Sequence, residues 1–213
     1  YCMAELIEVS IPEGSLFLGT EDFALGDGNL DGLNITHRLS MLMQREEEAC
    51  WMAFASGEST AAPRLEFLPP DKLLVSGVTR LVARCPMADE DAFKPFAVPL
   101  FDQAAAFINA ALGDGGKVYV HCTHGVSRSP SAIIWYLMKY RGMTALAACG
   151  LVKERRVKVS PGDGFVELML EEEGRLGVEP RTDKNALLKV LRKPWLADFK
   201  AGRVKLSQYS AIL

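Results

Sequence analysis

The chain has 213 residues, of which 49% are hydrophobic and 24% are charged, ordinary values for a globular protein that leave room for one domain and an extension. Its formal net charge of −3 excludes a general attraction to nucleic acid or anionic lipid, so any phosphate binding must come from a local basic site. We find no uninterrupted apolar run of the roughly 18 residues that a membrane span needs, and we expect no transmembrane segment.

The first half of the chain predicts short strands joined by loops. Strands are predicted over residues 16–18, 35–43 and 78–87. Residues 22–32 are rich in Gly, Asp and Asn and predict a loop. Residues 44–76 are less regular, since they begin like a helix with an acidic run and continue as a polar loop. A second acidic loop, Asp89-Glu90-Asp91, follows the third strand.

The second half is mostly helical. One further strand, over residues 117–121, separates two helical patterns. Helices are predicted over residues 100–112, 131–141, 144–156, 163–175 and 185–193. The last of these is short, basic and amphipathic. Strands that alternate with helices, followed by a helical half, favour an α/β fold in which helices cover a sheet.

Five cysteines are scattered along the chain without the spacing of a metal site. They are Cys2, Cys50, Cys85, Cys122 and Cys149. An odd, scattered set is typical of reduced thiols in a reducing compartment, so we expect a cytoplasmic or nuclear protein without a metal site.

A short loop between the predicted strand at 117–121 and the next helix carries the strongest chemical signal. It has Cys122 at its start, Gly125 in the middle and Arg128 at its end. A loop at a helix N-terminus turns backbone N–H groups inward, and the helix dipole adds partial positive charge. Gly125 permits dihedral angles that a side chain would forbid, and Arg128 supplies a planar fork of donors. The loop is therefore predicted to bind a phosphate dianion.

The same electrostatic field acts on Cys122. A thiol in such a place has a lowered pKa and is a candidate nucleophile that forms a phosphocysteine intermediate. Ser129 can donate a hydrogen bond to the Cys122 sulfur, and it is also a candidate N-cap. His121 lies too close in sequence to swing round as a base. We expect it to order the loop by hydrogen bonds and to help hold Cys122 as thiolate.

His121-Cys122-x5-Arg128-Ser129 resembles the signature loop of the cysteine-dependent protein phosphatases, and its flanks are similar to the small atypical dual-specificity phosphatases. The similar pieces are residues 15–19, 34–37, 101–108, 129–131 and 161–165, within roughly residues 10–177. The resemblance implies a mostly parallel sheet of about five strands, with the phosphate loop between a central strand and a helix. It also implies a phosphatase domain over residues 1–178, with an insertion at 44–76, and a helical extension over 179–213.

The resemblance also assigns roles. The phosphoryl group would be bound by Thr123, His124, Gly125, Val126, Ser127 and Arg128, without metal or cofactor. Cys122, Arg128 and Ser129 would be catalytic, together with an Asp that the family places about 30 residues before the Cys. Counting back through the helix at 101–108 puts Asp91 there, with Asp89 as the alternative. Both could instead belong to a merely solvated loop.

We therefore expect a dual-specificity phosphatase acting on phosphotyrosine and phosphoserine or phosphothreonine of protein substrates. An RNA 5′-triphosphatase is the nearest alternative, because residues 121–125 resemble its loop, but residues 127–130 depart from it. A phosphoinositide phosphatase would need basic residues where Thr123 and Val126 stand. A non-catalytic phospho-binding module is disfavoured by Cys122. No nucleic-acid partner is expected. Residues 44–76 and the extension are candidate protein-docking segments. The simplest interpretation of residues 44–76 is a surface excursion, and that of the extension is a helix packed on the domain.

Overall fold

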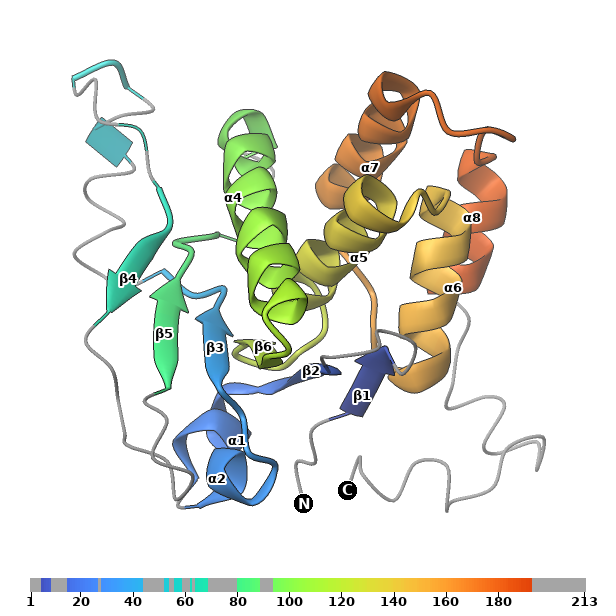
Figure 1. Cartoon of the computed structure of the whole chain (residues 1–213). Coiled ribbons are helices and arrows are strands. Elements are labelled where there is room, and N and C mark those ends of the chain that lie inside the picture. Colours follow the sequence, from blue (N-terminus) through green and yellow to red (C-terminus); the bar gives the residue numbers. More distant parts are fainter. Residues whose placement is uncertain are drawn as a thin grey trace.

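Six strands form one mixed sheet at the centre of the molecule (Figure 1). The computed structural model describes residues 5–8, 15–26, 28–43, 52–53, 56–58, 62, 64–68, 80–88 and 94–192. The strands are β1 (Glu5–Glu8), β2 (Ser15–Thr20), β3 (His37–Ser40), β4 (Glu66–Leu68), β5 (Leu81–Arg84) and β6 (Lys117–Cys122), in the order β1-β2-β6-β3-β5-β4.

The four inner strands are parallel and the two edge strands are antiparallel. β6 pairs with β2 and β3, and β3 pairs with β5, all in parallel. β1 and β4 run antiparallel to β2 and β5. The predicted α/β fold with a mostly parallel sheet is thus confirmed, with six strands where about five were expected. β4 comes from the segment at 44–76, most of which lies outside the described residues.

Helices cover the two faces of the sheet unequally (Figure 1). The helices are α1 (Glu21–Leu25), α2 (Asn29–Gly32), α4 (Lys94–Gly113), α5 (Arg128–Arg141), α6 (Ala145–Arg155), α7 (Asp163–Leu176) and α8 (Lys184–Leu191). On β6, Val118 and Val120 belong to the large core cluster with α4 to α8, whereas Tyr119 packs in a small cluster with α1 and α2. This alternation follows from the two-residue period of a strand.

Two helices lie where a loop was predicted over residues 22–32. The Thr20 hydroxyl caps α1 by accepting a hydrogen bond from the Phe23 N–H at 3.3 Å. Gly26 follows the end of α1, and Gly28, at a φ of 74°, caps the start of α2. The glycines therefore separate two short helices rather than prevent them, and the loop prediction was wrong on this point.

Two other helix starts also differ from the prediction. α4 begins at Lys94 rather than at residue 100, with Pro95 in its first turn, where a proline is tolerated, and Pro99 inside the helix. α5 begins at Arg128 rather than Ser131, with Ser127 at the N-cap position. Ser129 is therefore not the N-cap, since it lies inside the helix and its hydroxyl is bonded elsewhere.

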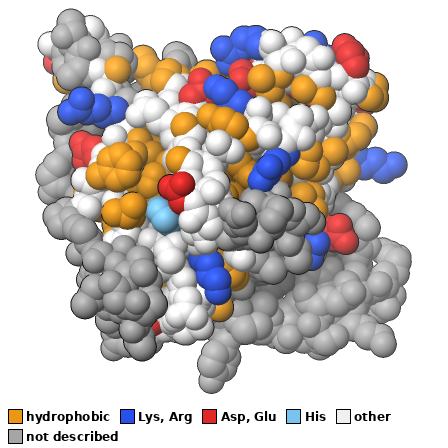
Figure 2. All heavy atoms as spheres, viewed as in Figure 1, with side chains coloured by type: hydrophobic (Ala, Val, Ile, Leu, Met, Phe, Trp, Pro, Cys, Tyr) orange, Lys and Arg blue, Asp and Glu red, His pale blue; other side chains and the backbone are white. Residues whose placement is uncertain are grey.

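α4 has an apolar composition that its place in the core explains. It is the one described helix long and apolar enough to cross a membrane, over Phe96–Gly113. Its residues Leu100, Phe101 and Ile108 are fully buried in the core cluster. On the surface in Figure 2, the charged side chains of the described residues are scattered among hydrophobic and polar ones, without a stripe of one sign.

The described part of the extension, residues 179–192, packs on the domain. Leu187 and Leu191 of α8 are buried in the large core cluster. The Lys153 ammonium of α6 donates to the carbonyls of Val159 at 2.7 Å and Leu191 at 2.9 Å. Burial and the nearby Arg192 charge lower the pKa of Lys153 to about 8. The helical part of the extension is thus a layer of the same core.

Candidate active site

The loop over residues 122–128 connects the central strand β6 to α5. Cys122 is the last residue of β6 and is only 2% exposed. Gly125 has a φ of 62°, which disfavours any side chain. A Cβ on Gly125 would also lie 2.6 Å from the Gly19 carbonyl oxygen, well inside contact distance. The chain can therefore close this turn only with glycine.

The carbonyl groups of residues 123–127 all accept hydrogen bonds from outside the turn. The donors are Glu21 N to Thr123 O (3.3 Å), Arg156 Nη2 to His124 O (3.0 Å), Arg156 Nε to Gly125 O (2.9 Å), Ser160 N to Val126 O (2.8 Å) and Ser131 N to Ser127 O (3.0 Å). A peptide plane that turns its carbonyl outward turns its N–H the opposite way. The loop therefore presents backbone donors to its interior, which is an anion-binding arrangement.

Arg156 is the functional residue that the sequence reasoning missed. The residue is 5% exposed, and its guanidinium donates to two consecutive carbonyls of the loop. In the sequence it stands in the run Glu154-Arg155-Arg156 at a helix end, which is indistinguishable from a solvated charged surface. Only the fold, which places the end of α6 beside the loop, reveals its role.

The Cys122 thiol lies among donors. The Ser129 hydroxyl donates to the Cys122 Sγ at 3.2 Å. Burial alone would raise the pKa of the Cys122 thiol, but the hydroxyl and backbone N–H of Ser129, the Arg128 charge and the Gly125 N–H together lower that pKa below its ordinary value. The arrangement favours a thiolate at the floor of an anion-binding loop.

Arg128 reaches across the mouth of the loop. Its Nη2 donates to the Thr123 Oγ1 at 3.1 Å, and its Nη1 donates to the Met87 carbonyl at 3.4 Å. Its Nε is buried and has no hydrogen-bond partner within the described ranges. The guanidinium thus keeps donor capacity for an incoming anion.

The remaining predicted binding residues differ in orientation. His124 is exposed at the rim, whereas Val126 is half-buried. The Ser127 hydroxyl accepts a hydrogen bond from the Gly162 N–H at 3.2 Å, which ties the loop to the start of α7. The Ser127 side chain therefore holds the loop from outside, and only the Ser127 backbone is available to the interior of the loop.

His121, expected to order the loop, has a buried ring without a side-chain partner among the described residues. It is 3% exposed, and neither ring nitrogen has a hydrogen-bond partner in the part of the chain that the structure describes. Burial is the largest cause that lowers the pKa of His121 to about 3, and the charge of Arg38 lowers that pKa further. The Cys122 backbone raises it by a smaller amount. The ring lies on the face of β6 opposite the Cys122 side chain, and its role in ordering the loop and in holding Cys122 as thiolate stays a prediction.

The two candidates for the general acid, Asp91 and Asp89, lie outside the described residues. The segment that follows β5 does reach the loop, since Arg128 donates to the carbonyl of Met87. Within the described ranges, no group of three or more His, Cys, Asp or Glu side chains is placed to hold a metal ion.

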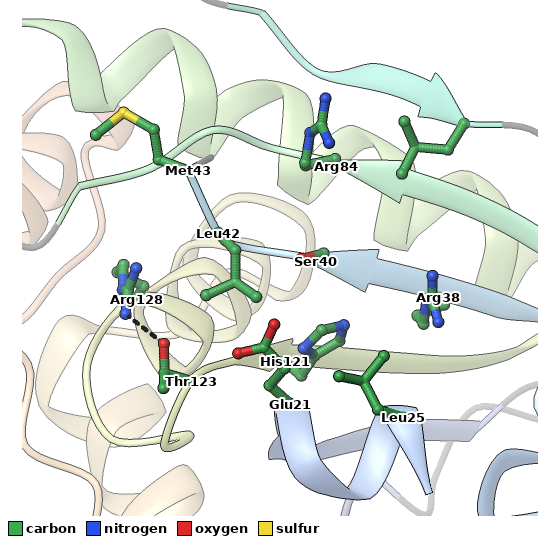
Figure 3. A pocket seen from close by; sticks show the side chains of 11 residues that line it. Glu21, Leu25, Arg38, Ser40, Leu42, Met43, Arg84, His121, Thr123 and Arg128 are labelled. Carbon is green, nitrogen blue, oxygen red and sulfur yellow. Dashed lines mark hydrogen bonds between the residues drawn. The ribbon is translucent and has the colours of Figure 1, made fainter. Parts of the chain in front are cut away.

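A cavity of about 360 Å³ opens beside the loop (Figure 3). Thr123 and Arg128 form its boundary with the loop, and His121 lies in its wall. The cavity lies on the α1 side of the sheet, because the side chain of His121 projects to the face opposite that of Cys122.

Comparison with known proteins gives consistent matches. The family model for the dual specificity phosphatase catalytic domain matches residues 69–175, about half of the chain. The chain is 31% identical over 169 residues to dual specificity protein phosphatase 1 of Arabidopsis thaliana, covering 79% of this chain and 71% of that protein. It is 42% identical over 76 residues to dual specificity protein phosphatase 5 of Rattus norvegicus, covering 36% of this chain and 20% of that protein.

A solved structure with the same fold is the human tyrosine phosphatase-like serine/threonine/tyrosine-interacting protein. It superimposes with a TM-score of 0.57 and 27% identity, over 82% of this chain and 98% of that one. The chain spans less than half the length of several curated relatives that it matches.

Proposed function

Because the chain belongs to the dual-specificity phosphatase family, we propose that it hydrolyses phosphotyrosine and phosphoserine or phosphothreonine in protein substrates through a phosphocysteine intermediate. The observation that carries this proposal is the 122–128 loop, in which five outward-bonded carbonyls leave backbone donors around a thiol of lowered pKa. Such preorganised donors stabilise the charge of a transferring phosphoryl group.

In the first step, the Cys122 thiolate attacks phosphorus, so that an S–P bond forms and the P–O bond to the side-chain oxygen breaks. The loop N–H groups and Arg128 hold the phosphoryl oxygens during the transfer. We assign Asp91 as the acid that protonates the leaving oxygen, with Asp89 as the alternative.

In the second step, water attacks phosphorus while the Asp91 carboxylate takes its proton. The S–P bond breaks, and inorganic phosphate and the Cys122 thiolate are released. The Ser129 hydroxyl, 3.2 Å from the sulfur, stabilises the departing thiolate by donating a hydrogen bond.

The test is a side-by-side assay of a phosphotyrosine peptide, a phosphothreonine peptide, a phosphoinositide and an RNA 5′-triphosphate, with Cys122→Ser as the control. Turnover of both peptides above the other two substrates is expected, with loss of activity by about 10⁴-fold or more in the control. Preference for the RNA or the lipid would reject the proposed substrate class, and turnover that survives in Cys122→Ser would reject the mechanism.

The acid is assigned by leaving-group dependence. Asp91→Asn is expected to slow hydrolysis of alkyl phosphates much more than that of aryl phosphates, whose better leaving group needs less protonation. Asp89→Asn serves as the matched variant. If Asp89→Asn shows that dependence and Asp91→Asn does not, the assignment passes to Asp89.

A further inference from the structure

The cavity beside the loop has a polar floor that the strand register creates. Ser40 is paired with both His121 and Arg84 on its neighbouring strands, and Arg38 precedes it by two residues. Directly paired residues of parallel strands project to the same face, so Arg38, Ser40, Arg84 and His121 lie together on the α1 side of the sheet. Leu39 projects to the opposite face, into the core.

Two guanidinium groups give this floor its charge. Arg38 and Arg84 line the cavity together with Arg128, and among the described residues that line it the one acidic side chain is that of Glu21. Arg84 also donates to Glu66 at 3.1 Å; the Arg84 side chain is 15% exposed and that of Glu66 49% exposed, so solvent partly screens this pair. Figure 3 shows His121 between Arg128 on one side and Arg38 on the other.

His121 brings buried hydrogen-bonding capacity without a partner. Both of its ring nitrogens are buried, and neither is bonded to any of the described residues. A buried polar group left unsatisfied costs roughly 1–3 kcal/mol, and native structures rarely retain one without a reason. Because the pKa of the ring is about 3, the ring is neutral near neutral pH and offers one N–H donor and one acceptor.

We propose that the cavity is a subsite for a second anionic group of the substrate, carried on a residue adjoining the phosphorylated one. Arg38 and Arg84 would bind the anion, His121 would donate its ring N–H, and Leu25 and Leu42 would contact the methylene groups of that residue. The inference rests on the proposed function, since Thr123 and Arg128 belong both to the loop and to the cavity wall.

The anion can be a carboxylate or a second phosphate, and the peptides distinguish the two. Three phosphotyrosine peptides share one sequence and differ only in the residues next to the phosphotyrosine. Both neighbouring positions carry Gln in the first peptide, Glu in the second, and a non-hydrolysable phosphonate analogue of phosphoserine in the third. We expect kcat/KM to rise by about tenfold from Gln to the better of the two anions, the gain of one charge-assisted hydrogen-bonded pair.

Arg38→Gln and Arg84→Gln are each expected to reduce this preference, and the double variant to abolish it. The small ester p-nitrophenyl phosphate engages the loop alone, so its kcat/KM is expected to stay unchanged. Arg155→Gln, an exposed cation on α6, is the matched control and should alter neither value. Arg38→Glu should reverse the preference, toward a peptide with Lys at the adjoining position.

The inference is overturned if the protein shows no preference for an anionic neighbour, or if the arginine variants retain that preference. It is also overturned if the variants lose activity equally on the peptides and on p-nitrophenyl phosphate, because the arginines would then support the loop rather than a subsite. Hydrolysis of the phosphotyrosine peptides in those cases leaves the proposed function standing.

A protein that hydrolyses none of these substrates contradicts the proposed function instead. Fluorescence anisotropy of the three labelled peptides with Cys122→Ser then tests the cavity separately, without turnover. Tighter binding of the anionic peptides that is lost in the Arg38→Gln background supports the subsite, and equal binding of all three peptides rejects it.

Discussion

His121 and Cys122 are neighbours in the chain, yet they face opposite sides of β6 and opposite kinds of site. On the Cys122 side, all five carbonyls of residues 123–127 are bonded before any ligand arrives. On the His121 side, a buried ring lacks hydrogen-bond partners among the described residues. The geometry of the first site is set by the protein, whereas the second is the proposed subsite, where we propose that a ligand contacts the buried ring. A fixed site suits the chemical step, which is the same for every substrate. A site that the ligand completes suits selectivity, which differs between substrates.

The largest loss of activity is expected from a substitution of Gly125, which distorts the loop on the Cys122 side. Gly125→Ala introduces a Cβ that would approach the Gly19 carbonyl oxygen to 2.6 Å at a positive φ, so the loop must shift. A displacement of about 1 Å costs on the order of 100-fold in rate, and kcat on p-nitrophenyl phosphate is expected to fall by at least that factor.

Gly150→Ala is the matched control for that change. Gly150 lies in α6 with open space around its Cα, so alanine should leave kcat unchanged and stabilise the protein by up to about 1 kcal/mol. Equal activity of both variants would show that the activity does not depend on the backbone conformation at Gly125.

Arg156→Met removes the outside support of the loop while touching none of the reacting groups. The carbonyls of His124 and Gly125 lose their donors, and kcat should fall by roughly 10- to 100-fold, with a smaller change in KM. Arg155→Met, one residue earlier and exposed, is the control that should stay fully active. Retention of wild-type kcat in Arg156→Met would deny it a positioning role.

Ser129→Ala tests the thiolate itself, and its effect should be smaller, roughly tenfold in kcat. Since the Ser129 hydroxyl helps to lower the pKa of Cys122, its removal raises that pKa, and the acidic limb of kcat/KM moves to higher pH. Ser131→Ala is the matched variant, because the Ser131 hydroxyl donates to the Ser127 carbonyl instead. An acidic limb that moves in Ser131→Ala but not in Ser129→Ala contradicts the assignment.

On the His121 side the expected effect is on stability and not on the rate. Its pKa is about 3 in the folded protein against an ordinary 6.5, so the unfolded chain binds more protons between these values. The free energy of unfolding therefore falls as the pH drops below 6.5, by up to about 1.4 kcal/mol per pH unit. His121→Asn should flatten this slope in urea unfolding measured between about pH 7 and pH 5, where the wild-type slope is expected.

The wild type, measured over the same pH range, is the reference for His121→Asn. If His121→Asn unfolds with the slope of the wild type, the burial of the His121 ring is not a source of acid lability.

The parts of the site that the sequence predicted are those whose chemistry is local in the chain. The spacing of Cys122, Gly125 and Arg128 encodes one turn, and the strand and helix on either side follow from apolar patterns that the fold confirms. Arg156 could not be found in this way, because its partners are set by how α6 packs beside the loop. The cavity could not be predicted for the same reason, since Arg38 and Arg84 are brought together only by the register of β3 with β5.

The helices α1 and α2 were missed for a different reason. The composition of residues 22–32 is that of a loop, and the glycines that end one helix and begin the next are the same glycines that suggest a loop. Local propensity is a weak guide for helices of one turn, whose stability comes from packing against residues such as Tyr119.

The packing of α8 has a practical consequence for anyone who shortens this chain. A polypeptide ending at residue 178, where the family resemblance fades, would lose Leu187 and Leu191 from the core, at roughly 1.5–3 kcal/mol for each side chain. It would also expose the side of α6 that they cover and remove one carbonyl acceptor of Lys153. The smallest unit suited to recombinant expression therefore extends to at least Arg192, whose guanidinium bonds Ser160 and Asp163 across the base of α7.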